Sequence, residues 1–255
     1  MDSSTPSGLP SVRRISLFAP LRWLGGAWSD LLRDPLPLLA YGVGLTLLGW
    51  AWVALIYVTH AAFWAYLLTC GLVFIAPLFA MGLYEAGRRL EKGERPTLGQ
   101  ILFVRGAARQ DMAYLGLSIL MLFFIWGSFA QIVYGLVSDR APTNWADFAA
   151  FAMTTSLGRG MLISGTIVGG IAGFAVFCCT VVSVPMLLDH DNDFFCAVVT
   201  SVRVVIRNFA PMMLWAVVIA ILLAAVAATG LVGLVIVFPW LGLASWRAYR
   251  ALVVS

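Results

Sequence analysis

The chain has 255 residues, of which 62% are hydrophobic and 11% are charged, and its mean hydropathy is +0.95. Soluble domains carry about 25% charged residues, so this composition argues against a soluble enzyme, a nucleic-acid binder and a disordered protein. The 16 basic and 12 acidic residues leave a net charge of +4, and the basic ones cluster beside apolar stretches, as in the cytoplasmic flanks of membrane proteins. We therefore expect an all-α polytopic membrane protein in contact with a lipid bilayer and not with nucleic acid.

The first part of the chain predicts a short cytoplasmic tail followed by a helix on the membrane surface. The tail is expected over residues 1–15, and a single membrane domain over 16–255. Apolar residues then recur at helical spacing, with charged residues on the other faces. They are Leu17, Leu21, Leu24, Trp28 and Leu31. Such an amphipathic helix can lie in the headgroup layer.

Long stretches without charge mark the membrane spans. Residues 35–84 carry no Asp, Glu, Lys or Arg, which suits two helices of about 20 residues each joined by a turn at Thr59-His60. Residues 208–246 are charge-free in the same way, with a turn expected near Thr229-Gly230. In all, we expect six spans, covering about residues 36–58, 62–87, 112–137, 161–187, 210–228 and 231–251.

The basic residues orient these spans. With six spans, only Arg140 and Arg159 fall on one side of the membrane, and the other Arg residues and Lys92 fall on the opposite side. Because positive residues concentrate in cytoplasmic loops, we expect both termini in the cytoplasm and the 138–159 loop outside.

Further amphipathic segments suggest an internal repeat. Residues 191–209 have the pattern of a surface helix, Thr97 and Gln100 form a capping-box pattern opening a helix from Leu98 to Arg109, and Trp145, Phe148 and Phe151 suggest an outer surface helix. The order of amphipathic helix, span and span then occurs three times. The second span of each unit holds a proline, at Pro77, Pro185 and Pro239.

Two kinds of packing feature lie inside the spans. Gly165, Gly169 and Gly173 share one helix face, where another backbone can approach closely; this contact is either internal or with another subunit. The three prolines each remove a helical hydrogen bond. They act either as static kinks or as the broken helices from which transporters build substrate sites.

Chemistry-bearing residues are sparse. Glu85 is either an ion-pair partner of Arg88 and Arg89 or a coupling carboxylate, and the acidic stretch from Asp189 to Asp193 either binds a divalent cation or caps the next helix. No catalytic signature occurs in the sequence. The two histidines, expected on opposite faces, cannot share a haem or copper. We therefore expect no cofactor, no metal and no enzymatic activity.

Several segments together resemble a known family. They are Ala19-Pro20-Leu21-Arg22-Trp23-Leu24, Gly82-Leu83-Tyr84-Glu85, Ser183-Val184-Pro185-Met186 and Pro239-Trp240-Leu241-Gly242. They resemble the bacterial membrane proteins known as domain of unknown function 2189, over nearly the whole chain. This resemblance implies an inner-membrane protein and transfers no functional residues.

Three functional hypotheses remain open. One is a non-enzymatic accessory or scaffold subunit of a membrane complex, with a membrane-protein partner or a second copy of the chain. The alternative is a carrier for a small or lipid-like molecule, which requires a polar cavity near the bilayer midplane. A third hypothesis, a membrane enzyme of unfamiliar type, requires polar side chains to converge in the fold.

Overall fold

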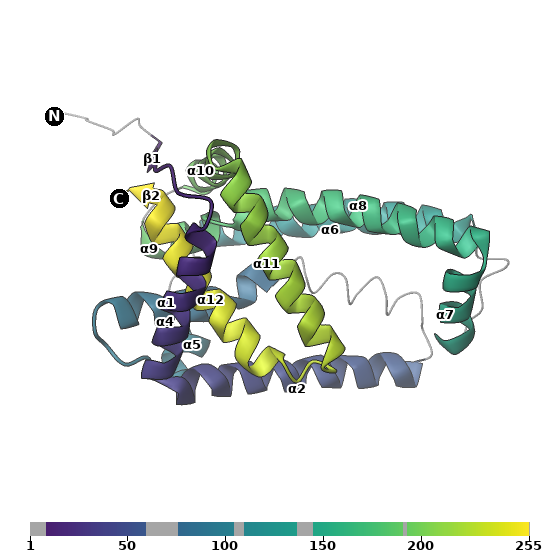
Figure 1. Ribbon diagram of the computed structural model, residues 1–255, viewed down its shortest axis with the longest axis horizontal. Helices are drawn as coiled ribbons and strands as arrows, with labels where there is room; N and C mark the ends of the chain where they lie inside the picture. Colours follow the sequence, from purple (N-terminus) through teal and green to yellow (C-terminus); the bar gives the residue numbers. More distant parts are fainter. Residues whose placement is uncertain (1–8, 60–75, 105–109, 137–144, 191–192, 255) are drawn as a thin grey trace.

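The computed structural model describes residues 9–59, 76–104, 110–136, 145–190 and 193–254, and these residues are overwhelmingly helical (Figure 1). The helices are α1 (Ala19–Arg33), α2 (Pro35–Thr59), α4 (Met81–Glu91), α5 (Leu98–Leu102), α6 (Gln110–Gly135), α7 (Trp145–Thr154), α8 (Ser156–Thr180), α9 (Ser183–Asp189), α10 (Phe194–Arg207), α11 (Phe209–Ala228) and α12 (Leu234–Leu252). Two short strands, β1 (Ser11–Val12) and β2 (Val253–Val254), complete the described elements.

Four segments of the described chain are long and apolar enough to cross a membrane. They are Pro35–Leu55, Gln110–Val133, Ser156–Asp189 and Phe209–Ala228. They coincide with the predicted first, third, fourth and fifth spans, so the expected all-α membrane protein is confirmed at this level. Most of the predicted second span, with the turn residue His60, lies outside the described residues. Helix α12 covers most of the predicted sixth span, from residue 234 onward, but is not among the four.

The predicted fourth span differs from a single straight helix. Helix α8 ends at Thr180, a turn covers Val181 and Val182, and α9 begins at Ser183. The physical reason is Pro185, which has no N–H to donate to the carbonyl of Val181 four residues earlier. The membrane-spanning segment is therefore divided into two pieces near the end at which Asp189 lies.

Helices α1 and α10 are the predicted amphipathic helices. Helix α1 runs across the long axis of the molecule instead of along it (Figure 1), which is the orientation expected of a helix in the headgroup layer. It packs against α12 and α11, and the ring of Trp23 meets that of Trp215 edge-on at 5.8 Å. The indole N–H of Trp240 also donates to the carbonyl of Leu24 at 2.8 Å. The surface helix is thus fastened to the spans by its buried face.

The two ends of the described chain pair with each other. Strands β1 and β2 are antiparallel, with Ser11 opposite Val254 and Val12 opposite Val253. The buried side chain of Asn208 secures the same segment, because its Oδ1 accepts from Ile15 N and its Nδ2 donates to Arg13 O, both at 3.0 Å. Residues from the predicted tail therefore take part in the fold, at the same end of the molecule as the C-terminal strand.

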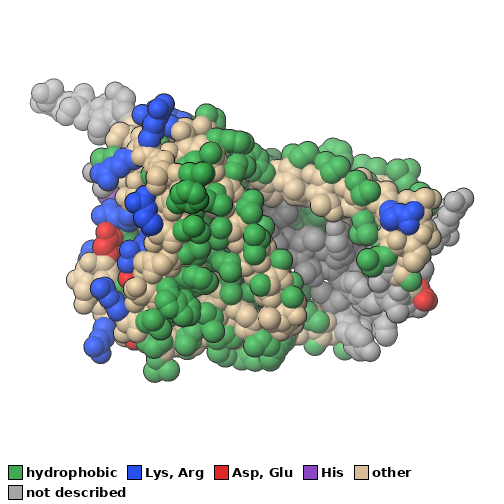
Figure 2. Space-filling model, in the orientation of Figure 1, with side chains coloured by type: hydrophobic (Ala, Val, Ile, Leu, Met, Phe, Trp, Pro, Cys, Tyr) green, Lys and Arg blue, Asp and Glu red, His purple; other side chains and the backbone are tan. Residues whose placement is uncertain are grey.

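Three helices that contain or follow the three prolines meet at one end of the molecule. Helix α4, helix α9 and α12 pack against one another, and Figure 2 shows most of the visible Lys and Arg side chains at this end, with broad hydrophobic surface beyond it. We call it the charged end.

Candidate functional site

A network of ionic contacts at the charged end ties helices together across the sequence. Arg247 of α12 donates through Nε and Nη2 to the two carboxylate oxygens of Asp30 in α1, at 2.6 and 2.8 Å. Asp189, at the end of α9, accepts from the hydroxyl of Tyr249 at 3.1 Å and lies 3.5 Å from Arg250. Arg250 also donates to Glu91 of α4 at 3.2 Å. These contacts are structural, since they join the surface helix α1 and the helices α4, α9 and α12.

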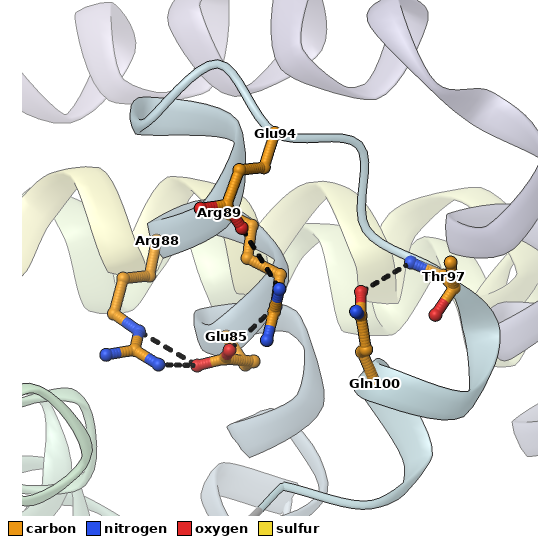
Figure 3. Close-up of polar contacts among 6 residues, drawn as sticks. All are labelled: Glu85, Arg88, Arg89, Glu94, Thr97 and Gln100. Atoms are coloured by element: carbon orange, nitrogen blue, oxygen red, sulfur yellow. Dashed lines mark hydrogen bonds and ion pairs between the residues drawn. The ribbon is translucent and has the colours of Figure 1, made fainter.

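Glu85 of α4 is the centre of a second cluster, which Figure 3 shows. Its Oε2 accepts from Nε of Arg88 at 2.9 Å and lies 2.7 Å from Nη2 of the same guanidinium group. Its Oε1 accepts from Nε of Arg89 at 2.8 Å, and Arg89 Nη1 donates to Glu94 at 3.0 Å. The predicted ion pairs of Glu85 are therefore confirmed, and the carboxylate holds two guanidinium groups side by side.

The spacing of these residues explains the cluster. Residues three and four positions apart lie on the same face of a helix, so Glu85 reaches both Arg88 and Arg89 within α4. The Glu85 side chain is 8% exposed, whereas those of Arg88 and Arg89 are 33% and 27% exposed. The carboxylate is thus covered by the two arginines, and the cationic groups are the part that reaches the surface.

The two arginines open onto a pocket of about 600 Å³ between α4, α5 and α9. The pocket is lined by Glu85, Arg88, Arg89, Thr97, Gly99, Gln100, Phe103, Val104 and Leu188. Thr97 and Gln100 form its α5 side, and the predicted capping box between them is confirmed by the 3.0 Å bond from Thr97 N to Gln100 Oε1 (Figure 3). Helix α5 itself ends at Leu102, and the rest of the predicted helix to Arg109 lies mostly outside the described residues.

The acidic stretch after α9 is divided between two structural roles. Asp193 accepts from Cys196 N at 2.7 Å and so caps α10, as the capping hypothesis predicts. Asp189 takes part in the ionic network, and Asp191 lies outside the described residues. In the part of the chain that is described, no group of three or more His, Cys, Asp or Glu side chains is placed to hold a metal ion.

The glycine face of α8 lies partly against α6. A Cβ atom added at Gly169 would lie 3.3 Å from the indole nitrogen of Trp126, whereas one added at Gly173 would meet nothing within 4 Å. Gly165 lies half-buried on the same helix. Gly173 is therefore a position where a second backbone has room to approach, and the choice between internal and intersubunit contact stays a prediction.

The three prolines have different surroundings. Pro185 lies just after the break between α8 and α9, Pro239 lies inside the continuous helix α12, and Pro77 lies in the helical residues 76–79 before the turn at Ala80. The carbonyl of Val235, four residues before Pro239, lies against Gly42 of α2. The pocket described above is lined by none of the three prolines, and the choice between static kinks and the broken helices of a substrate site stays a prediction.

Sequence reasoning found Glu85, Arg88, Arg89, Thr97 and Gln100 through local spacing, but not the pocket that joins them. It also missed the partners of Asp30 and Asn208, which come from distant parts of the chain. No periodic pattern in the sequence signals such contacts.

Comparison with known proteins gives one match. Residues 65–189 match the family model described as "Predicted integral membrane protein (DUF2189)", which confirms the resemblance for the segments at 82–85 and 183–186; the segments at 19–24 and 239–242 lie outside the matched residues. Neither a search of curated proteins nor a search of solved structures gave a match.

Proposed function

We propose that this chain, whose residues 65–189 match a family of integral membrane proteins, is a non-enzymatic accessory or scaffold subunit of a membrane complex. We place it in the bacterial inner membrane with six spans and three repeats of amphipathic helix, span and span. The order of the described elements supports the repeat: α1 precedes α2, α5 precedes α6, and α10 precedes α11.

The observation that carries this proposal is the exposure of the spans. The four candidate spans bury only 17–28% of their most apolar windows within the described chain. Most residues of these windows therefore keep some exposed surface in the described chain, which can meet lipid or a neighbouring helix, and the helices of membrane complexes associate through such surfaces. The carrier alternative calls for a polar cavity at the bilayer midplane, whereas the described pocket lies at the charged end.

Gly173 provides the test of the scaffold role. A Gly173→Leu variant should fold, because a side chain there meets open space, but it should block an approaching backbone. We expect native mass spectrometry after gentle detergent extraction to find the wild-type chain in an assembly and the variant as a monomer.

Gly160→Leu is the matched control, since position 160 is also open on the same helix and is never three or four residues from Gly165, Gly169 or Gly173, so that it lies on the opposite face. It should keep the assembly. A strictly monomeric wild-type chain with no accompanying membrane protein would overturn the proposal. Equal loss of assembly in both variants would show that assembly does not depend on the glycine face.

The proposed orientation has its own measurement. A reporter that is active only in the cytoplasm should be active when fused after Ser255 and inactive when inserted in the 138–159 loop. The physical reason is the concentration of basic residues on the side of the termini. Activity from the 138–159 insertion would reverse the orientation.

A further inference from the structure

We infer that the pocket between α4, α5 and α9 is a binding site for a phosphate group. The inference goes beyond the scaffold role and does not depend on it. Its basis is the pair of guanidinium groups, Arg88 and Arg89, that Glu85 holds side by side at the pocket wall (Figure 3).

Both arginines keep hydrogen-bond donors that are not used within the cluster. A guanidinium group carries five N–H donors in a rigid fork. Arg88 uses Nε and Nη2 toward Glu85, which leaves Nη1 outside these bonds, and Arg89 uses Nε toward Glu85 and Nη1 toward Glu94, which leaves Nη2. The remaining Nη groups of two neighbouring guanidinium groups can each donate a charge-assisted hydrogen bond to an oxygen of the same phosphate group.

The wall of the pocket is positively charged. Glu85 and Glu94 together balance the formal charge of the two arginines, but the charged side chains that line the pocket are Glu85, Arg88 and Arg89 alone, with one net positive charge. Glu94, whose side chain is 52% exposed, is the weaker partner because water screens it. The Glu85 carboxylate is almost fully covered, so an approaching anion meets the arginines first.

An exposed apolar surface lies beside the pocket. Helix α5 and the residue after it present Leu98, Leu102 and Phe103 to the outside, and the Phe103 side chain, which also lines the pocket, is 82% exposed. Exposed apolar side chains next to a basic pocket at the charged end suit an amphiphile with an anionic head and apolar tails. A phospholipid headgroup is one source of the phosphate, and free phosphate is the other.

Binding measurements on the full chain purified in detergent test the site. The probes are phosphatidylglycerol, inorganic phosphate and oleate, the last being an anionic amphiphile without phosphate. We expect the Arg88→Gln variant to lose affinity for phosphatidylglycerol by about ten-fold or more, the size expected for a lost charge-assisted hydrogen bond. Arg203→Gln is the matched control, because Arg203 is an exposed arginine of α10 that does not line the pocket; it should bind like the wild type.

Each outcome decides. Phosphatidylglycerol binding that Arg88→Gln alone weakens supports a lipid phosphate, and the same dependence for inorganic phosphate supports the free ion. The site would be overturned if neither phosphatidylglycerol nor inorganic phosphate bound. It would also be overturned if Arg88→Gln and Arg203→Gln lost affinity equally, or if oleate bound with the same dependence on Arg88. If Arg88→Gln does not fold, Arg88→Lys keeps the charge but removes the fork; it should still weaken binding several-fold, and unchanged affinity would overturn the site.

Discussion

Replacing Gly42 by alanine is expected to destabilise the chain by roughly 1–3 kcal/mol, the usual cost of forcing extra atoms into a packed contact. A Cβ atom at this position would lie 2.2 Å from the carbonyl oxygen of Val235 and 2.8 Å from its carbon. These are backbone atoms, which cannot rotate away as a side chain can, so α2 and α12 must separate. The midpoint of thermal unfolding in mild detergent measures the effect.

Gly44 provides the control on the same helix. A Cβ atom there would meet nothing within 4 Å, so Gly44→Ala should be neutral or stabilising, since alanine favours a helix over glycine by about 0.8–1.0 kcal/mol. If Gly42→Ala unfolds at the same temperature as Gly44→Ala, the close crossing of α2 and α12 is wrong.

The contact also explains how a proline is accommodated in α12. Pro239 cannot donate an N–H to the carbonyl of Val235, and the Cβ direction of Gly42, which is occupied by a hydrogen, points at that same carbonyl. A Cα–H···O contact of this kind contributes about 0.5–1 kcal/mol. The glycine and the proline, on different helices, are thus two parts of one packing arrangement.

The helices themselves could be predicted because their signals are local. The predicted spans 36–58 and 210–228 differ by only a residue at either end from α2 (Pro35–Thr59) and α11 (Phe209–Ala228), since prolines or polar residues end the apolar runs. The ion pairs of Glu85 and the Thr97–Gln100 capping box were predictable for the same reason, because a helix brings neighbouring turns together.

Contacts between distant segments could not be predicted. Gly42 is one of 24 glycines, and nothing in its neighbourhood in the sequence marks it as the one that meets Val235. Nothing in the sequence near Asn208 indicates that its side chain accepts a hydrogen bond from the backbone N–H of Ile15. The pocket depends on Leu188 of α9 lying near α4, which only the packing of three helices determines.

The ion pair between Asp30 and Arg247 is expected to stabilise the attachment of α1 to α12. Breaking a fully buried pair costs about 3–5 kcal/mol, but here the side chains are 10% and 41% exposed. We therefore expect Arg247→Gln to cost roughly 1–3 kcal/mol, because Asp30 stays buried without its cation. A double-mutant cycle with Asp30→Asn isolates the interaction, measured as the free energy of unfolding in detergent.

The pair formed by Glu91 and Arg250 is the comparison, since its side chains are 46% and 39% exposed. Its cycle with Glu91→Gln and Arg250→Gln should give a coupling below about 1 kcal/mol, and added salt should weaken it further. The two pairs differ in burial of the carboxylate and in geometry, because Asp30 accepts two bonds at 2.6 and 2.8 Å whereas Glu91 accepts one from Arg250 at 3.2 Å. Equal coupling energies would show that neither difference strengthens the bond of Asp30. A larger coupling at Asp30 that persists at high salt would identify this pair as the principal electrostatic tie between the surface helix and the last helix of the chain.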